Sequence, residues 1–222
     1  MNEFERPKTA QEAVLREIRQ RLLEGRLRPG EAIRPDKLGE ELGVSAVPVR
    51  EALRILEGEK QVFHRPHRGY IVTELDIEDL EEIFRIREIL EAEAIRLAMP
   101  NITAEHMEVI LDATQVMETP DRSIYELGMA NRKFHFTFYE ASEMPRLVSM
   151  INSLWDAAEP HHFRSPNYTS PENRNHINVE HRRIVDAIVS RDTEKMITEM
   201  HDHRQKAFQI LECELVATVK GN

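Results

Sequence analysis

The chain has 222 residues, of which 41% are hydrophobic, and it carries 30 Lys and Arg against 40 Asp and Glu, a formal net charge of −10. This length and apolar content suffice for one large or two smaller folded domains, which excludes an intrinsically disordered chain. The single cysteine, Cys213, cannot form an internal disulfide, and no apolar signal core opens the sequence. Uncharged apolar runs fall short of the ~18 residues of a membrane-spanning helix. We therefore expect a soluble, cytoplasmic protein.

Charge and glycine are distributed unevenly along the chain. Residues 1–74 carry 14 Lys and Arg and 13 Asp and Glu, which leaves 16 and 27 for residues 75–222, so the net charge divides as +1 and −11. Six of the eight glycines also lie before residue 75. This predicts two domains, 1–74 and 75–222. An acidic chain can still bind DNA when one near-neutral domain gathers its arginines on one face.

In the first domain, apolar spacing and turn residues predict three helices and a small hairpin. The third helix has Ser45 as its candidate N-cap and Pro48 in its first turn. Extended runs around Val62 and at 70–73 are joined by a basic loop. Three helices and a basic hairpin are the layout of a winged helix-turn-helix. The helices are expected over residues 9–24, 35–43 and 46–58.

This layout binds DNA because the N-terminal turns of the third helix fit the major groove, while a basic hairpin tip reaches phosphates or the minor groove. Positive charge is present at both places in this sequence. A protein-docking module whose arginines only solvate one face is the alternative interpretation. The candidate DNA contacts are Arg34, Ser45, Val47, Pro48, Arg50, Arg54, His67, Arg68 and Gly69.

The first domain resembles the DNA-binding domain of the GntR family of bacterial transcription regulators over about 65 residues. The resemblance is carried by the PGE turn, the LGVS-x-x-PVREALR-x-LE run and the RGY-x-V wing. It implies that the partner is double-stranded operator DNA. The family usually has Arg where this chain has Ala46, and Gly near the position where Lys60 and Gln61 stand. These departures leave the fold intact and bear on operator sequence and affinity.

The second domain is predicted to be a bundle of six or seven helices, so the whole chain is mainly α. Thr103 and Asp192 are candidate N-caps, and residues 163–174 read as the one clear loop. The segments REILEAEAIRLA, NRKFHFTFYEAS and HRRIVDAIVSRDTEKMITEMHDH resemble the FCD effector domain of the FadR subfamily, which implies effector binding and dimerisation. Helices are expected over residues 76–99, 103–118, 122–142, 144–160, 175–190 and 193–218.

Four polar side chains are predicted to converge in this bundle. Asn131 and His135 are four residues apart, which places them on one helix face. His181 and His203 each lie 11 residues from Asp192, so in an antiparallel helix pair both reach the same height, ~16 Å from the turn. Three imidazoles and one amide oxygen suit Zn²⁺, Ni²⁺ or a similar divalent ion. A hydrogen-bonded polar core or a metal-free ligand pocket is the alternative.

Two further residues bear on the metal affinity and on the ligand set of this predicted site. Metal-binding members of the subfamily that the chain resembles usually have Asp where Asn131 stands, and the missing negative charge predicts weaker metal binding. His201 lies two residues from His203 on the same helix and should point about 200° away from the site.

Arg87 lies within an apolar helical stripe, where a cation needs an anion. That anion is either Glu91, four residues on, or the carboxylate of an effector. The resemblance favours the effector, because many relatives use the matching Arg for small organic acids. Trp155 is expected in the core or in a pocket wall. The stripe consists of Ile83, Leu90, Ala94 and Leu97.

Three functions compete. In the first, a homodimer places two winged helices on a near-palindromic operator, and a small carboxylate bound by the metal and Arg87 changes their spacing. The second is a metal-dependent enzyme, which would lack a placed general base and leave the DNA-binding module unexplained. The third is a metal-free regulator that senses a bulky acyl thioester, in whose pocket four polar groups would be costly. The sequence favours the first and leaves the effector, the operator and the direction of regulation open.

Overall fold

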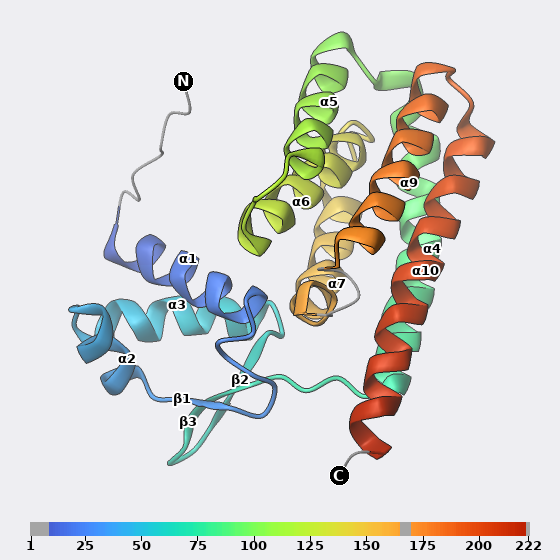
Figure 1. The fold of residues 1–222 in the computed structure, drawn as a ribbon. Coiled ribbons are helices and arrows are strands. Elements are labelled where there is room, and N and C mark those ends of the chain that lie inside the picture. The colour runs from blue at the N-terminus through green and yellow to red at the C-terminus, as the bar shows by residue number, and fades with distance from the viewer. Residues whose placement is uncertain (1–8, 165–169, 221–222) are drawn as a thin grey trace. The chain divides into compact units, whose positions relative to one another are not determined.

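The computed structural model describes residues 9–164 and 170–220 (Figure 1). The chain forms two compact units, Met1–Glu74 and Leu75–Asn222. The division falls where the charge balance and the glycine content of the sequence change.

The N-terminal unit contains the three predicted helices and a three-stranded antiparallel sheet of order β1-β3-β2. The outer strand β1 was not predicted, because two residues are too few to give a periodic signal. It pairs with β3 through Ala32 opposite Ile71, and β2 pairs with β3 through Val62 opposite Val72. The elements are α1 (Ala10–Leu23), β1 (Ala32–Ile33), α2 (Pro35–Leu42), α3 (Ala46–Gly58), β2 (Val62–Arg65) and β3 (Gly69–Val72).

Local signals explain where these helices begin and end. Thr9 and Glu12 form a capping box at the start of α1, and Gly43 ends α2 in the left-handed conformation. Ser45 stands at the N-cap position of α3 with extended backbone, but its side chain makes no capping hydrogen bond. The capping role predicted for its hydroxyl is therefore wrong, although α3 begins where it was expected.

Within residues 75–164 and 170–220 the C-terminal unit consists of helices joined by turns and short loops, without a strand. The predicted loop at 163–174 is too long, because α7 continues to Arg164 and α9 begins at Pro171. The Ser170 side chain accepts from the Asn173 backbone N–H, and proline suits the first turn of a helix. Residues 165–169 of that prediction lie outside the described residues. The helices are α4 (Ile77–Ala98), the 3₁₀ helix η1 (Met99–Asn101), α5 (Ala104–Glu118), α6 (Ile124–Glu140), α7 (Pro145–Arg164), α9 (Pro171–Val189) and α10 (Thr193–Lys220).

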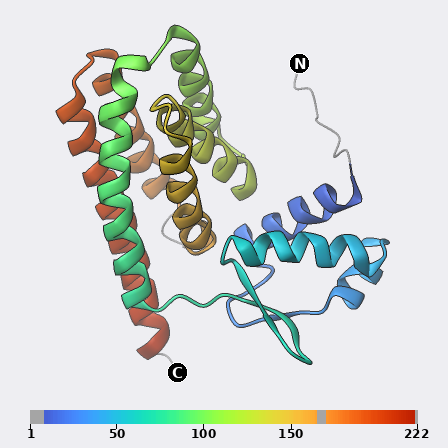
Figure 2. The same ribbon diagram turned by 180° about the vertical axis from the view of Figure 1, so that it is seen from behind.

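The turn between α9 and α10 is fixed by two side chains. Asp192 Oδ1 accepts from the Lys195 backbone N–H at 2.9 Å, as expected of a cap. Arg191 donates to the carbonyl oxygens of Met99 and Ile102, both at 2.7 Å, and so ties this turn to the end of α4 and η1. Helices α4 and α10 lie side by side in both views (Figures 1 and 2).

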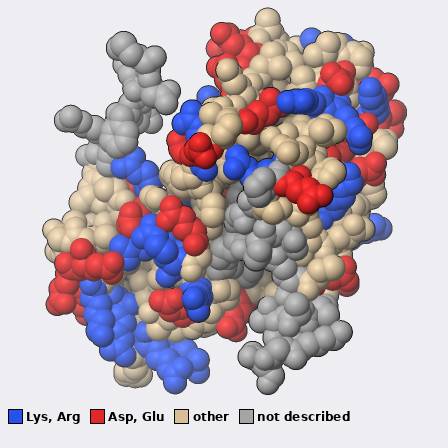
Figure 3. Space-filling model, in the orientation of Figure 1, with Lys and Arg blue, Asp and Glu red and all other residues tan. Residues whose placement is uncertain are grey.

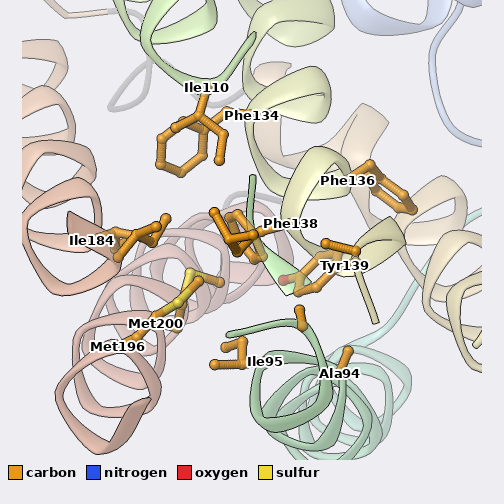
Figure 4. Packing of buried hydrophobic residues seen from close by; sticks show 14 of the residues in the cluster. Ala94, Ile95, Ile110, Phe134, Phe136, Phe138, Tyr139, Ile184, Met196 and Met200 are labelled. Atoms are coloured by element: carbon orange, nitrogen blue, oxygen red, sulfur yellow. The ribbon is translucent and has the colours of Figure 1, made fainter. Parts of the chain in front are cut away.

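The core of this unit gathers apolar side chains from several helices (Figure 4). Phe134, Phe138 and Tyr139 of α6 are fully buried, and Met196 and Met200 of α10 pack in the same cluster. Among the described residues, no helix is long and apolar enough to cross a membrane.

The buried face of α4 differs from the predicted stripe. Leu97 is 37% exposed, so its assignment to that stripe is wrong. The observed face keeps Arg87, as predicted, and is rotated toward Phe84 and Glu91; Arg87 is 8% and Glu91 0% exposed. The buried side chains of α4 are Leu80, Phe84, Arg87, Glu91, Ala94, Ile95 and Ala98.

Candidate DNA interface and metal centre

The first turns of α3 present an accessible surface. Val47 is 60% exposed, and the side chain of Arg50 is 53% exposed. Arg50 Nη2 lies 2.9 Å from Asp36 Oδ1 of α2, an ion pair open to solvent and therefore weak. Arg54, one turn further along α3, is also exposed.

The wing is the turn between β2 and β3. His67 adopts a φ of 65° and Gly69 a φ of 84°. A Cβ at Gly69 would lie 2.5 Å from the Ile33 carbonyl oxygen, so glycine is needed for β1 to approach β3. Figure 3 shows Lys and Arg gathered toward the hairpin end of the N-terminal unit, with acidic residues beside them. Of the nine candidate DNA contacts, Pro48 and Gly69 are half-buried and the other seven are exposed.

Three histidines from three helices meet inside the C-terminal unit. His135 comes from α6, His181 from α9 and His203 from α10, and one potential ligand atom of each lies within 4.8 Å of the others. The ring centroids are 5.5 Å apart for His135 and His181, 5.4 Å for His135 and His203, and 4.8 Å for His181 and His203. The helical geometry predicted from Asp192 therefore brings these side chains together.

The donor set fits a divalent metal. His135 is 1% exposed, and neither of its ring nitrogens has a hydrogen-bond partner among the described residues. Buried polar atoms are rarely left in this state. Burial, followed by the two neighbouring histidines, holds the pKa of His135 well below its ordinary value, so the ring is neutral and can offer a lone pair.

The spacing of the ring nitrogens is also close to that of a metal site. Two nitrogens bound to one tetrahedral Zn²⁺ at 2.0–2.1 Å lie about 3.4 Å apart. The histidine nitrogens lie within 4.8 Å of one another, so a pair has to close by up to about 1.4 Å when the ion binds.

Asn131 shares a cavity with this cluster, whereas His201 does not. The cavity has a volume of about 40 Å³ and is lined by Asn131 and His135 of α6, His203 of α10 and residues of α4 and α7. His201 Nδ1 lies 3.0 Å from Glu88 Oε1 and its side chain is 42% exposed, as expected of a residue on another face of α10. The other lining residues are Phe84, Arg87, Glu91, Trp155, Ala158, Glu159, Met200, Arg204 and Ala207.

Glu91 is the centre of a buried polar network in the cavity wall. Its Oε1 accepts from Arg87 Nε at 2.7 Å and from Trp155 Nε1 at 2.8 Å, and its Oε2 accepts from Arg204 Nη1 at 2.6 Å. Burial opposes ionisation of Glu91, but Arg87 and Arg204 outweigh it, so its pKa lies below the ordinary value.

Sequence reasoning found only part of this network. It gave the pair of Arg87 with Glu91 as one of two alternatives, and it placed Trp155 in the core or in a pocket wall. The Arg87 guanidinium also stacks on the Trp155 ring, 4.4 Å from its centroid. Arg204 was missed, because its contact with Glu91 depends on how α10 packs against α4.

Known proteins match both units. Residues 10–72 match the family described as bacterial regulatory proteins, gntR family, and residues 82–206 match the FCD domain. The HTH-type transcriptional regulator McbR of Escherichia coli (strain K12) is 33% identical over 186 residues, which are 82% of this chain and 83% of McbR. The uncharacterized HTH-type transcriptional regulator YdhC of Bacillus subtilis (strain 168) is 28% identical over 184 residues, 80% of each chain.

The structure of E. coli McbR/YncC superimposes with a TM-score of 0.79 at 27% identity, covering 94% of this chain and 99% of that chain. The relatives of this chain named above are transcriptional regulators and not enzymes, which excludes the hypothesis of a metal-dependent enzyme. With a gntR-type DNA-binding domain followed by an FCD domain, the chain belongs to the GntR family of bacterial transcriptional regulators.

Proposed function

We propose that this regulator binds its operator as a homodimer and senses a small carboxylate at a divalent metal ion held by Asn131, His135, His181 and His203. The observation that carries the proposal is His135, buried with both ring nitrogens lacking a hydrogen-bond partner among the described residues, beside two further histidines. The ion, Zn²⁺ or else Ni²⁺ or a similar metal, supplies a Lewis-acidic centre with open positions for an oxygen ligand.

The charge balance around the cavity supports an anionic effector. The described lining of the cavity contains two arginines, Arg87 and Arg204, and two carboxylates, Glu91 and Glu159, and each of the four is in an ion pair, so a divalent ion adds two positive charges without compensation. An anion that binds the ion restores the balance, and this favours a carboxylate over a neutral ligand. The pairs are Arg87 and Arg204 with Glu91, and Arg132 with Asp156 and Glu159.

Arg87 remains the proposed contact for the effector. Its hydrogen bond to Glu91 uses Nε, and a guanidinium carries four further N–H donors. The stacking on Trp155 holds the plane of this group at the cavity wall. Pairing with Glu91 and binding of a carboxylate are therefore compatible roles for one side chain.

The small size of this cavity argues against a bulky acyl thioester as the ligand that binds in it. About 40 Å³ can hold an ion with one or two small ligand groups. An acyl chain would also have to cover three imidazoles and an amide, which is costly for polar groups.

Two measurements on purified protein test the proposed sensing function. Elemental mass spectrometry should find about one divalent ion per chain, and a thermal-shift screen of small carboxylic acids should find ligands that raise Tm only when metal is present. Protein that folds but takes up no Zn²⁺ or Ni²⁺ would contradict the metal site. The polar-core alternative would then hold.

The proposed homodimer is tested separately: light scattering during size-exclusion chromatography should give the mass of a dimer.

Replacing Asn131 by Asp should raise metal affinity and weaken the dependence of metal binding on the effector. The amide provides an oxygen without charge, so the ion in the wild type gains more from an anionic ligand than it would beside an aspartate. Because binding linkage is reciprocal, metal and effector raise each other's affinity by the same factor. Calorimetric titrations of the wild type and of the variant with Zn²⁺, each with and without the carboxylate that gives the largest thermal shift, measure this factor. Weaker Zn²⁺ binding by the Asp variant, or no coupling in the wild type, would mean that Asn131 is not a ligand.

Arg50→Ala should reduce operator affinity by about 1–3 kcal/mol with little change in stability, because Arg50 is exposed on the first turns of α3, where base edges are read. A duplex selected by the protein from a random library serves as the operator, in gel-shift titrations at fixed salt. Arg26→Ala is the matched control, since this half-exposed arginine pairs with Glu17 and Glu24 away from α3. Equal loss in both variants would indicate general charge attraction instead of base readout. Failure to select any duplex would favour the docking-module alternative.

A further inference from the structure

A carboxylate of α9 contacts one of the three clustered histidines from outside the cluster. Glu180 is 8% exposed and directly precedes His181. Its Oε2 lies 2.8 Å from His203 Nδ1, and its Oε1 lies 2.7 Å from Lys206 Nζ. Glu180 therefore binds two side chains of α10 that are one helical turn apart.

The chemistry of this contact decides which nitrogen of His203 carries its proton. An ionised carboxylate can only accept hydrogen bonds, so the imidazole must donate from Nδ1. A neutral imidazole has one N–H, and with this proton on Nδ1 the lone pair is left on Nε2. Ring orientation is fixed by the same bond, because the side chains of Glu180 and His203 are only 10% and 13% exposed.

We propose that Glu180 is a positioning residue that holds His203 in the Nδ1–H tautomer and so makes Nε2 the atom that binds the metal. This inference rests on the proposed metal site. Histidine ligands of metals generally donate their second N–H to such an acceptor, and loss of the acceptor typically weakens metal binding 10- to 100-fold. Lys206 compensates the charge of Glu180 and keeps its second oxygen occupied. Helix α9 thus supplies one ligand, His181, and orients another on α10.

The tautomer can be measured without metal or effector. In ¹⁵N-histidine protein freed of metal, at a pH near 8, two-bond ¹H–¹⁵N correlations distinguish Nδ1–H from Nε2–H, and the His203 signals are assigned by their absence in His203→Gln. We expect Nδ1–H at His203 in the wild type. In Glu180→Leu we expect the Nε2–H form to appear, together with a 10- to 100-fold loss of Zn²⁺ affinity in competition with a chromophoric chelator. Glu180→Gln keeps the shape and an acceptor oxygen, so its loss should be smaller.

Glu88→Leu is the matched control, because Glu88 Oε1 lies 3.0 Å from Nδ1 of His201, a residue outside the cluster. This variant should leave both the His203 tautomer and Zn²⁺ affinity unchanged. An Nε2–H proton on His203 in the wild type, or unchanged Zn²⁺ affinity in Glu180→Leu, overturns the role of Glu180 and leaves the metal site standing. A wild type that takes up no Zn²⁺ overturns the metal site together with this role. If the Leu variant does not fold, the tautomer of His203 in the wild type decides, because Nε2–H there overturns the role of Glu180 and Nδ1–H supports it.

Discussion

Replacing His181 and His203 together by alanine should abolish stoichiometric metal binding and the stabilisation that metal provides. Two of three imidazole ligands are lost, and His135 with Asn131 cannot hold a divalent ion at comparable affinity. At a free Zn²⁺ concentration of 100 times the wild-type Kd, the lost stabilisation is about 2.7 kcal/mol. Elemental mass spectrometry and melting curves with and without Zn²⁺ measure both effects.

His201→Ala is the control for this double variant, because His201 lies on the same helix and also pairs with a carboxylate, Glu88. It should keep its metal and most of its Tm. Melting curves of the double variant with and without Zn²⁺ separate metal loss from packing loss, since added Zn²⁺ should stabilise the wild type and His201→Ala but not the double variant. Full metal occupancy in the double variant would rule out the three-histidine site.

The common height of His181 and His203 could be predicted because it depends on helix geometry alone. Equal distances of His181 and His203 from the turn at Asp192 place them at one height whatever the details of packing. The short α9–α10 turn, capped by Asp192, satisfies the one assumption of that argument. The same reasoning separated His201 from His203.

Other features lay beyond the sequence for physical reasons. The network of Glu91 with Arg204 joins residues 113 positions apart, and such a pairing depends on which helices pack together. The contact between Glu180 and His203 likewise requires the rotation of α9 about its axis. The start of α9 at Pro171, in contrast, could have been predicted. The Ser-Pro-Glu sequence at 170–172 carries helix-start signals, and the assignment of a loop at 163–174 overlooked them.

Arg87 shows how an apolar pattern can mislead about a charged residue. The predicted stripe ended at Leu97, which is exposed, whereas Phe84 and Glu91 lie on the buried face. A buried ion pair four residues apart has the same sequence spacing as a solvent-exposed one. Among the described residues, Arg204 and the indole of Trp155 donate the further hydrogen bonds that offset the cost of burying this pair, and both come from other helices.

Glu91→Gln should therefore destabilise the C-terminal unit by about 3–5 kcal/mol, because it leaves two buried guanidinium groups without an anion. Glu91 is 0% exposed, while the side chains of Arg87 and Arg204 are 10% and 4% exposed. Trp155 is the single tryptophan of the chain, so its fluorescence during urea unfolding reports on this unit. Glu93→Gln is the control: Glu93 forms an exposed pair with Arg96 on the same helix, and its loss should cost at most about 1 kcal/mol.

The effect of Glu91→Gln should also depend on pH, with a sign that follows from the lowered pKa of Glu91. The folded protein holds this carboxylate ionised below its ordinary pKa near 4.5, whereas the unfolded chain takes up a proton there. The stabilisation by Glu91 is then complete above the unfolded pKa and decreases as pH falls through the folded pKa. Glutamine does not titrate, so the difference in unfolding free energy between wild type and variant should be constant from neutral pH down to about 5 and shrink at lower pH. A variant as stable as the wild type at neutral pH would show that the two arginines do not need this carboxylate.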